Sequence, residues 1–539
     1  MEVEQPDAYV MGREGAEAGS SGYKKDLGTW HVVLYALGAI LGPAIAYAPV
    51  YTVAFAGPVG ILSWIIAMLM LIPVGLVYAE LGTAWPKAGG VAYYPSRSNG
   101  PLVGAINGWS SFVGYLLVGP VIVFALVEYL SFYFPSFYGS DGLLSVQGIL
   151  VAEIFLILIF LINMLRIKHM GNINSVLTIV TVVLIAVVLI GLAFSFNTSN
   201  LNNPSYGGIA PYGAAGLFTA ITFTVFGYGG FRQPVDYSEE AKNPGKSIPL
   251  AIIISIVISA AIYALLAFVF VGAATPSLFG KNGAGNWASF YGSTSPYASE
   301  AQVLALPIIV VVAVIVALIA TFKDGIIYYG GTARVGQTLA KEDKFFPRWL
   351  DKMTKSGVPV FSVILVFVVS LILVALGRSL ATIIGFMVDA FLLSYAPGCV
   401  SLAVFRKTDP EVKRPFKLPG AKILAPIAWL VTTLMLYWST FLVIELIVPL
   451  DLAGIVLLVF YARHNKVSLK SLGYGIWMPI FFLFILGYSY IGSSLFGGIN
   501  IVPFPWDSVI FAVVALIFYY IAVESGVRHR RLSISAAKA

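Results

Sequence analysis

Long apolar segments alternate with short polar loops from residue 30 to residue 524 of this chain. A helix needs about 20 consecutive apolar residues to cross a bilayer, and many of these segments reach that length. The pattern therefore predicts an all-α polytopic membrane protein with about fourteen spans. The candidate spans are residues 30–55, 58–82, 101–134, 147–167, 172–195, 213–240, 249–273, 301–338, 359–377, 379–405, 421–443, 446–463, 474–497 and 505–525.

The first apolar segment contains residues that cannot continue a regular helix. Pro43 lacks a backbone donor and its ring crowds the carbonyl of residue 39, while Gly38 and Gly42 make a break less costly. A broken helix at membrane depth persists only where it faces protein or a watery cavity. The alternatives are a proline-kinked helix or a Gly-xxx-Gly face that packs against a neighbouring helix.

The sixth segment contains a second interruption of the same kind. Gly227, Gly229, Gly230 and Pro234 lie so close together that a uniform helix is not expected. The first and sixth spans run in opposite directions across the membrane. Interrupted spans at matching places of two five-span units are typical of secondary transporters that have inverted repeats and bind substrate near the bilayer midplane.

The segments also predict how the chain is divided. Two five-span repeats, the second inverted, are followed by two further pairs of spans and flanked by cytoplasmic tails. The expected divisions are a mobile N-terminal tail at 1–29, the repeats at 30–195 and 213–405, spans 11 and 12 at 421–463, two additional spans at 474–525, and a C-terminal tail at 526–539.

Composition and charge narrow the possible functions. The chain is 59% hydrophobic and 11% charged, whereas a soluble domain carries about a quarter charged residues. A formal net charge of +7 would suit nucleic acid, but the loops predicted to face outward contain only Lys281 and Arg378. Arg232 and Lys323 fall inside spans, and the remaining lysines and arginines face the cytoplasm. This positive-inside bias predicts a plasma-membrane protein with both termini in the cytoplasm, in contact with lipids and not with nucleic acid.

The sequence shows no pattern that indicates catalysis or a cofactor. The single cysteine, Cys399, excludes an internal disulfide framework, and the four histidines lie at the ends of segments. We therefore expect no metal site, no cofactor and no enzyme activity. Asn197 begins a glycosylation sequon in an outer loop, and its use is left open.

Several motifs resemble those of the amino acid–polyamine–organocation (APC) permeases. The match covers roughly residues 30–463, and the two spans that follow are similar to the extra pair of the cationic amino acid transporter branch. The motifs are Tyr78-Ala79-Glu80-Leu81-Gly82 with Pro86-Lys87-Ala88-Gly89-Gly90-Val91-Ala92-Tyr93, Glu239-Glu240-Ala241-Lys242-Asn243-Pro244 with Ile248-Pro249, Arg334, Ala340-Lys341-Glu342-Asp343-Lys344-Phe345-Phe346-Pro347, and Arg414-Pro415-Phe416-Lys417-Leu418-Pro419-Gly420.

This resemblance implies the inverted five-plus-five fold and secondary transport of amino acids or related amines. In the family, amides of the first break hold the substrate carboxylate beside a half-helix N-terminus. Carbonyls near Ile40, Phe226 and Gly229 would take the ammonium group, and Phe226 stands where a large aromatic closes over the substrate. The implied substrate-binding residues are Ile40, Leu41, Gly42, Pro43, Ala44 and Ile45, with Phe226, Gly227, Tyr228, Gly229 and Gly230.

The chain departs from the family pattern in three places. Pro43 and Ala44 stand where a small Ser or Gly is usually followed by Gly, so the carboxylate site has fewer donors. Arg232 replaces a frequent acid, and span five lacks the lysine of proton-coupled relatives. A secondary active transporter of amino acids working by alternating access is the predicted function; an amine or polyamine carrier or exchanger is the alternative.

Buried charges are candidates for coupling or gating. A charge at the bilayer centre costs at least ~2.5 kcal/mol on insertion scales. Lys323 and Asp324 resemble positions where sodium-coupled relatives place ion ligands. We hypothesise that the Lys323 ammonium replaces sodium and faces the first break. The alternative is a lysine that snorkels toward the inner interface.

Three further buried charges complete the candidate set. Arg232 and Asp236 are one helical turn apart and could pair. Asp389 lies in the middle of span ten without a local partner, and either Lys323 or Arg232 could neutralise it. A proton relay through Asp389 or Asp324 and a permanent ion pair both remain open. The expected partners are thus a small amino acid or amine, with a proton as candidate coupling ion.

Overall fold

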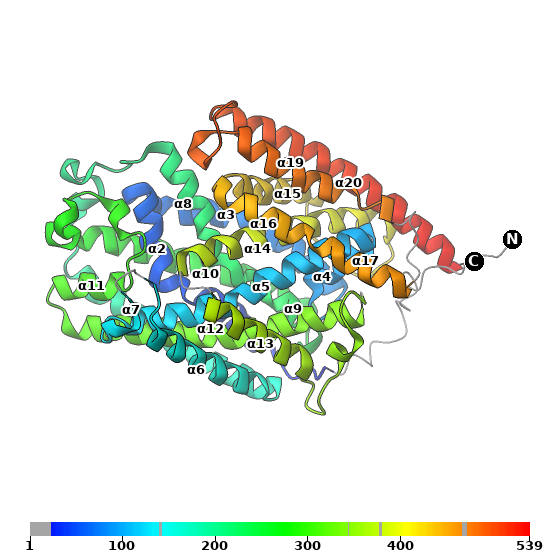
Figure 1. Ribbon diagram of the computed structural model, residues 1–539, viewed down its shortest axis with the longest axis horizontal. Coiled ribbons are helices and arrows are strands. Elements are labelled where there is room, and N and C mark those ends of the chain that lie inside the picture. Colours follow the sequence, from blue (N-terminus) through cyan, green and yellow to red (C-terminus); the bar gives the residue numbers. More distant parts are fainter. Residues whose placement is uncertain (1–22, 140–142, 343, 377–379, 466–471, 539) are drawn as a thin grey trace.

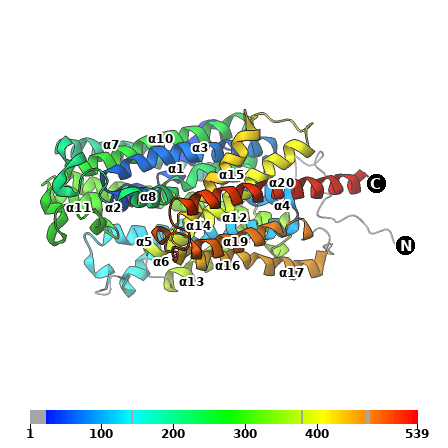
Figure 2. The same cartoon turned by 90° about the horizontal axis from the view of Figure 1, so that it is seen from above.

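Helices make up nearly all of the regular structure in this chain. The computed structural model describes residues 23–139, 143–342, 344–376, 380–465 and 472–538. In two perpendicular views, most helices run along the longest axis of the molecule (Figure 1) (Figure 2). Two isolated β-bridges are the only β pairing within these ranges.

The helices are named in chain order. They are α1 (Thr29–Ile40), α2 (Ala44–Ala56), α3 (Gly60–Ala84), α4 (Gly90–Asn99), α5 (Pro101–Leu130), α6 (Val146–Asn163), α7 (Ile167–Ala193), α8 (Gly213–Tyr228), α9 (Gln233–Asp236), α10 (Pro244–Ala273), α11 (Pro296–Val303), α12 (Pro307–Lys341), α13 (Val360–Leu376), α14 (Leu380–Thr408), α15 (Ala421–Tyr437), α16 (Phe441–Leu452), α17 (Gly454–Asn465), α19 (Trp477–Ile491) and α20 (Trp506–Lys538).

The helices have the length and apolarity of membrane spans. Ten helical segments of the described chain are long and apolar enough to cross a bilayer, and α1, α13, α15 and α19 are shorter apolar helices. Large apolar side chains such as Leu161, Val176 and Ile190 are exposed on the outside of the bundle. A surface of this kind is stable against lipid and not against water. The prediction of an all-α polytopic membrane protein is confirmed; the number of fourteen spans and the inverted relation of the repeats stay predictions.

Helix α5 packs against both α12 and α14, and it is buried along almost its whole length. The first broken span lies beside them: α1 contacts α7, α10 and α12, and α2 contacts α8 and α10. Helix α20 packs on α14 and α15, and α19 packs on α16 and α20, at the outside of the bundle (Figure 1). The broken spans are therefore enclosed by protein, as broken backbone at membrane depth requires.

The first break is present as predicted. Helix α1 ends at Ile40 and α2 begins at Ala44, so Leu41, Gly42 and Pro43 lie outside both helices. Pro43 provides the N-cap of α2, a position at which its missing N–H costs nothing.

The second interruption is milder than the glycines suggest. Helix α8 ends at Tyr228 and continues as a 3₁₀ turn, Gly229–Arg232, into the single turn of α9. A 3₁₀ turn keeps backbone hydrogen bonds internal while it tightens the helix, and it often marks a hinge. A Cβ atom added to Gly230 would overlap the backbone of Ala39, so the two interrupted spans touch there.

The chain segments at the two described ends are ordered by contacts. Residues 1–22 of the predicted N-terminal tail lie outside the described residues. Leu27, just before α1, pairs with the segment after α9: its N–H donates to the Glu240 carbonyl at 3.0 Å, and its carbonyl accepts from Lys242 N–H at 2.9 Å. In the predicted C-terminal tail, residues 526–538 continue α20, and Arg530 binds Asp409 at 2.9 Å.

Candidate functional site

A central cavity lies between the two interrupted spans. It is lined by residues of α1, α2, α5, α8, α12 and α14 and by Pro43 of the first break. Asp324 is the charged member of a mostly apolar set. The lining residues are Ala39, Ile40, Pro43, Ala44, Val118, Val121, Phe226, Asp324, Tyr328, Met387 and Phe391.

Lys323 closes the open end of α1. Its ammonium, fully buried, donates to the carbonyls of Gly38 and Leu41, both at 2.7 Å. The last carbonyls of a helix lack partners within the helix, and the C-terminal end of the helix dipole favours a cation. The ammonium therefore lies at the first break, where the hypothesis placed it, and its role in coupling stays a prediction.

Asp324 follows Lys323 on α12 and faces the same break. Its side chain is only 3% exposed and contacts Gly42 so closely that a Cβ atom on Gly42 would overlap the carboxylate. Within the described part of the chain, Asp324 Oδ1 has no hydrogen-bond partner. Position 42 therefore requires glycine, and a buried carboxylate oxygen beside the cavity is left unsatisfied.

Two backbone carbonyls of the breaks are bound by tyrosines from distant helices. Tyr263 on α10 donates its hydroxyl to the Ile40 carbonyl at 2.5 Å, and Tyr395 on α14 donates to the Gly229 carbonyl at 2.9 Å. The resemblance implies that these carbonyls take the substrate ammonium. Sequence reasoning missed both tyrosines, although a tyrosine in an apolar span needs a buried hydrogen-bond partner and so carries a signal.

The start of α2 offers unpaired amides. The N–H groups of Ile45 and Ala46 bond back to the carbonyls of Gly42 and Pro43 at 3.2 and 3.1 Å. Among the residues described, the N–H groups of Gly42 and Ala44 have no hydrogen-bond partner. A helix N-terminus with free amides attracts an anion.

Some of the implied substrate-binding residues face other surroundings. Ile45 lines a different cavity, Gly227 packs against the Trp64 ring, and the Tyr228 hydroxyl donates to the Trp64 carbonyl at 2.7 Å. Leu41 contributes its carbonyl to Lys323. The structure thus brings Ile40, Pro43, Ala44 and Phe226 to the central cavity, and it does not bring the whole implied set together.

Arg232 and Asp236, which the spacing allowed to pair, form no direct ion pair in the described chain. Tyr115 lies between them, donating to Asp236 Oδ2 at 2.5 Å and accepting from Arg232 Nη2 at 3.4 Å. The 3₁₀ turn changes the spacing that would align residues i and i+4 in a regular helix. The Arg232 guanidinium instead lies 4.1 Å from the centre of the Tyr395 ring and donates to Ser394.

Neither candidate cation neutralises Asp389. Lys323 binds the end of α1 and Arg232 binds Ser394 and Tyr115, so both are engaged elsewhere. Ser439 is the polar neighbour of the Asp389 carboxyl, which is fully buried on α14. The sequence interpretation that Lys323 or Arg232 would balance Asp389 is therefore wrong.

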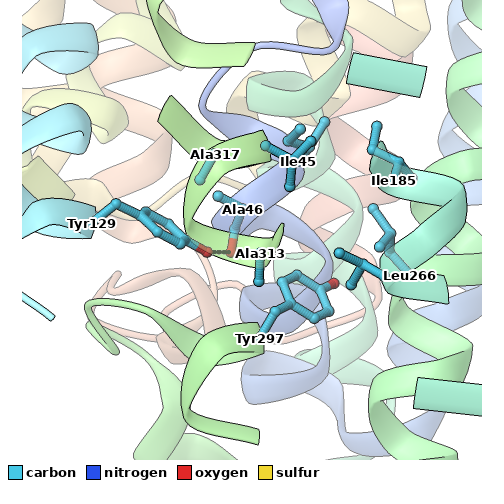
Figure 3. A pocket seen from close by; sticks show the side chains of 10 residues that line it. Ile45, Ala46, Tyr129, Ile185, Leu266, Tyr297, Ala313 and Ala317 are labelled. Atoms are coloured by element: carbon cyan, nitrogen blue, oxygen red, sulfur yellow. Dashed lines mark hydrogen bonds between the residues drawn. The ribbon is translucent and has the colours of Figure 1, made fainter. Parts of the chain in front are cut away.

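A second cavity lies farther along α2. Its lining is almost entirely apolar (Figure 3). Figure 3 shows the Tyr129 hydroxyl directed at Ala46, whose carbonyl it binds at 3.0 Å, and the Tyr297 side chain beside Leu266. Because no charged side chain lines this cavity, the central cavity is the candidate site for an amino acid.

The end of the molecule beyond α1 and α9 is held by ion pairs, and we call it the ion-paired end. Arg334 binds Glu240 through two hydrogen bonds of 2.8 and 2.6 Å, both side chains being buried. Arg166 binds Asp26 at 2.7 Å, and this hydrogen bond lowers the pKa of the Asp26 carboxyl.

Other pairs join further loops at the same end. Glu80 binds Arg406 and Arg414, and Lys87 lies 3.5 Å from Glu342. Burial alone would lower the pKa of Lys87, but attraction to Glu342 and Glu239 outweighs burial and raises it.

Comparison with known proteins shows that the sequence is similar to amino acid permeases. A sequence model described as "Amino acid permease" matches residues 27–462. The chain is 31% identical over 514 residues to the glutamate/serine transporter AimA of Bacillus subtilis, covering 93% of this chain and 94% of that protein. It is 30% identical to the aspartate-proton symporter of the same organism, covering 94% and 97%. The branched-chain amino acid permease BcaP, also from Bacillus subtilis, is 25% identical over 84% of this chain and 96% of that protein.

Proposed function

Because this chain belongs to the amino acid permease family and is a multi-pass amino acid transporter, we propose that it carries a small neutral amino acid through the central cavity. The observation that carries the proposal is the cavity itself. It lies between two interrupted spans, and Pro43 and Ala44 at the start of α2 line it. Two relatives are named for the amino acids they transport, which supports the same chemistry here.

The amides of Gly42 and Ala44 would hold the substrate carboxylate. Both N–H groups lie at the positive end of the α2 dipole, and both are free in the described structure. Pro43 between them contributes no donor, so the site relies on two amides. These two amides would supply the hydrogen bonds that lipid cannot offer to the substrate carboxylate.

The cavity wall favours a small uncharged side chain. Val118, Val121, Met387 and Phe391 are apolar, and no cation stands among the lining residues to take a side-chain carboxylate. Arg232 lies outside the lining and is bound to Ser394 and Tyr115. Two relatives are named for glutamate and aspartate, so acidic substrates provide a sharp test of this point.

An amine carrier is the second candidate, supported by one specific observation. Pro43 removes an amide from the carboxylate-binding turn, while Asp324 adds a negative charge to the cavity. Both features suit a cation without a carboxylate. Competition of uptake by free amino acids and by the corresponding amines separates the two candidates.

Lys323 would couple transport to a proton. As an ammonium it makes charge-assisted bonds to Gly38 and Leu41, and such bonds are roughly twice as strong as neutral ones. Loss of the proton weakens both bonds and releases the end of α1 from α12. The ammonium then does the work of a bound sodium ion, and the name of the aspartate-proton symporter supports a proton as driving ion. The excess of basic residues in the loops of the ion-paired end supports a cytoplasmic position for that end, with both termini inside the plasma membrane.

Uptake by purified protein in liposomes tests the function and the coupling. We expect concentrative uptake of small neutral amino acids driven by an inward proton gradient, unchanged when choline replaces sodium. Lys323→Ala should lower uptake at least 10-fold while the protein stays folded and monodisperse. Lys246→Ala, at an exposed lysine, is the matched control. Sodium-dependent uptake, or wild-type rates in Lys323→Ala, would contradict the coupling proposal.

A further inference from the structure

The geometry points to Asp324 as the residue that binds the substrate's α-ammonium group, in place of the backbone carbonyls of the two breaks. The inference rests on the proposed function and names the substrate class of that site: α-amino acids with a free amino group. It concerns a residue on α12, whereas the resemblance implies main-chain oxygens of the two interrupted spans.

Four carbonyls of the two breaks already accept a side-chain hydrogen bond. Lys323 occupies the carbonyls of Gly38 and Leu41, and Tyr263 occupies that of Ile40. Tyr395 occupies the carbonyl of Gly229 on the second span. An ammonium group that approached the Gly38 and Leu41 carbonyls would also be repelled by the positive charge of Lys323.

Asp324 is the unsatisfied acceptor in the cavity. It lines the cavity, is 97% buried, and has an Oδ1 atom without a partner in the described chain. A buried charge without hydrogen bonds is costly, so a ligand that supplies donors and positive charge is strongly favoured there. A primary ammonium supplies three N–H donors and makes charge-assisted bonds to a carboxylate.

The Asp324 carboxylate and the amides at the start of α2 are adjacent. Their spacing limits how far apart the two charges of a ligand can be. The Asp324 carboxylate contacts Gly42, and the Gly42 amide is one of the two without a backbone acceptor in the described chain at the start of α2, where the proposal places the substrate carboxylate. A ligand bound to both must hold its carboxylate and its ammonium on neighbouring atoms. This arrangement matches an α-amino acid and disfavours γ-amino acids and long polyamines.

The charges of the site also balance when a zwitterion binds. Lys323 and Asp324 contribute one positive and one negative charge beside the first break. An ammonium at Asp324 and a carboxylate at the α2 N-terminus add no net charge to this low-dielectric site. A lone cation or a lone anion would leave an uncompensated charge in the bilayer.

A cycle of two proteins and two ligands tests the inference. Binding of a small neutral amino acid and of its 2-hydroxy acid, which replaces the ammonium with a hydroxyl, is measured by calorimetry on the wild type and on Asp324→Asn. We expect the variant to lose about 10- to 100-fold in affinity for the amino acid, the range of a hydrogen bond to a charged group. Affinity for the hydroxy acid should change less than 3-fold.

A control and a second measurement guard against a folding defect. Asp451→Asn removes another fully buried carboxylate, on α16 and outside the cavity lining, and should bind the amino acid as the wild type does. On wild-type protein, modification of Asp324 by a carbodiimide, read by mass spectrometry, should be blocked by the amino acid and not by the hydroxy acid.

Different outcomes overturn different statements. Equal weakening of both ligands in Asp324→Asn, unchanged amino acid binding in that variant, or equal protection by both ligands would overturn the ammonium assignment. If the wild-type protein neither binds nor transports any amino acid in the panel, the proposed function itself fails.

Discussion

The two interrupted spans solve the same problem, unpaired backbone inside a membrane, in different ways. At the first, Leu41, Gly42 and Pro43 leave helical structure, and side chains from α10 and α12 bind the exposed carbonyls. At the second, a 3₁₀ turn keeps the backbone helical, and Tyr395 binds the carbonyl of Gly229.

The two interruptions also differ in the groups that hold them: a charged lysine holds the first, and aromatic rings around an arginine hold the second. The first break depends on Lys323, whose hydrogen bonds weaken when a proton leaves. The second surrounds Arg232 with the rings of Tyr78, Tyr115 and Tyr395, and a guanidinium does not lose its proton in proteins. If Lys323 couples transport to a proton as proposed, the first span should respond to protons and the second should stay rigid.

The ion pairs that hold the two spans at the ion-paired end also differ in strength. After α9, Glu240 pairs with Arg334 in a buried, doubly hydrogen-bonded contact, whereas before α1 the partner of Asp26 is the half-exposed Arg166. Buried pairs lose much when one partner is removed, and exposed pairs contribute little. The second span should thus be the more firmly anchored of the two.

Arg334→Ala should have the largest effect. It leaves Glu240 buried without its cation, which costs about 3–5 kcal/mol of unfolding free energy. Unfolding in mixed micelles titrated with dodecyl sulfate measures the change. Arg528→Ala, which breaks an exposed pair on α20, is the control and should stay near the wild-type value. A loss below 1 kcal/mol in Arg334→Ala would contradict the firm anchor.

Gly230→Ala should have an intermediate effect, because it acts where the two spans touch. The new Cβ atom would overlap the backbone of Ala39, and backbone cannot rotate away as a flexible side chain can. Overpacking of this kind costs about 1–3 kcal/mol, and uptake should fall with it. The same titration applies, with Gly487→Ala as control, since no atom lies within 4 Å of that position in α19. Equal stability of the two variants would mean that the spans do not depend on this contact.

Removal of the Asp26–Arg166 ion pair before α1 should have the smallest effect on stability, and this effect should depend on pH. The pKa of Asp26 is lower folded than unfolded because Arg166 binds the carboxylate. Its contribution is therefore present above the unfolded value of about 3.9 and is lost as pH falls through the folded pKa. Thermal midpoints of wild type and Asp26→Asn should differ slightly at pH 6 and converge below about pH 4. A difference that grows on acidification would reverse the assignment.

The sequence predicts the features of the fold and the site that depend on residues close together in the chain, and it does not predict those that depend on distant residues. Pro43 and the glycines beside it break a helix by local chemistry, so the first break was visible in the sequence. The tyrosines that bind the exposed carbonyls lie far away in the chain, and local patterns do not reveal such contacts. The pairing of Arg232 with Asp236 failed because its rule assumes a regular helix, and the 3₁₀ turn could not be seen beforehand. Helix α4 was missed because it is short, polar and contains Pro95.

The β-bridge between Leu27 and Ala241 couples the two spans mechanically. The bridge joins the segment that precedes α1 to the segment that follows α9. An outward tilt of either α1 or α9 would therefore pull on the other helix. Opening of this end would then be a single hinged motion of one paired unit, started by release of the lysine and resisted by the arginine.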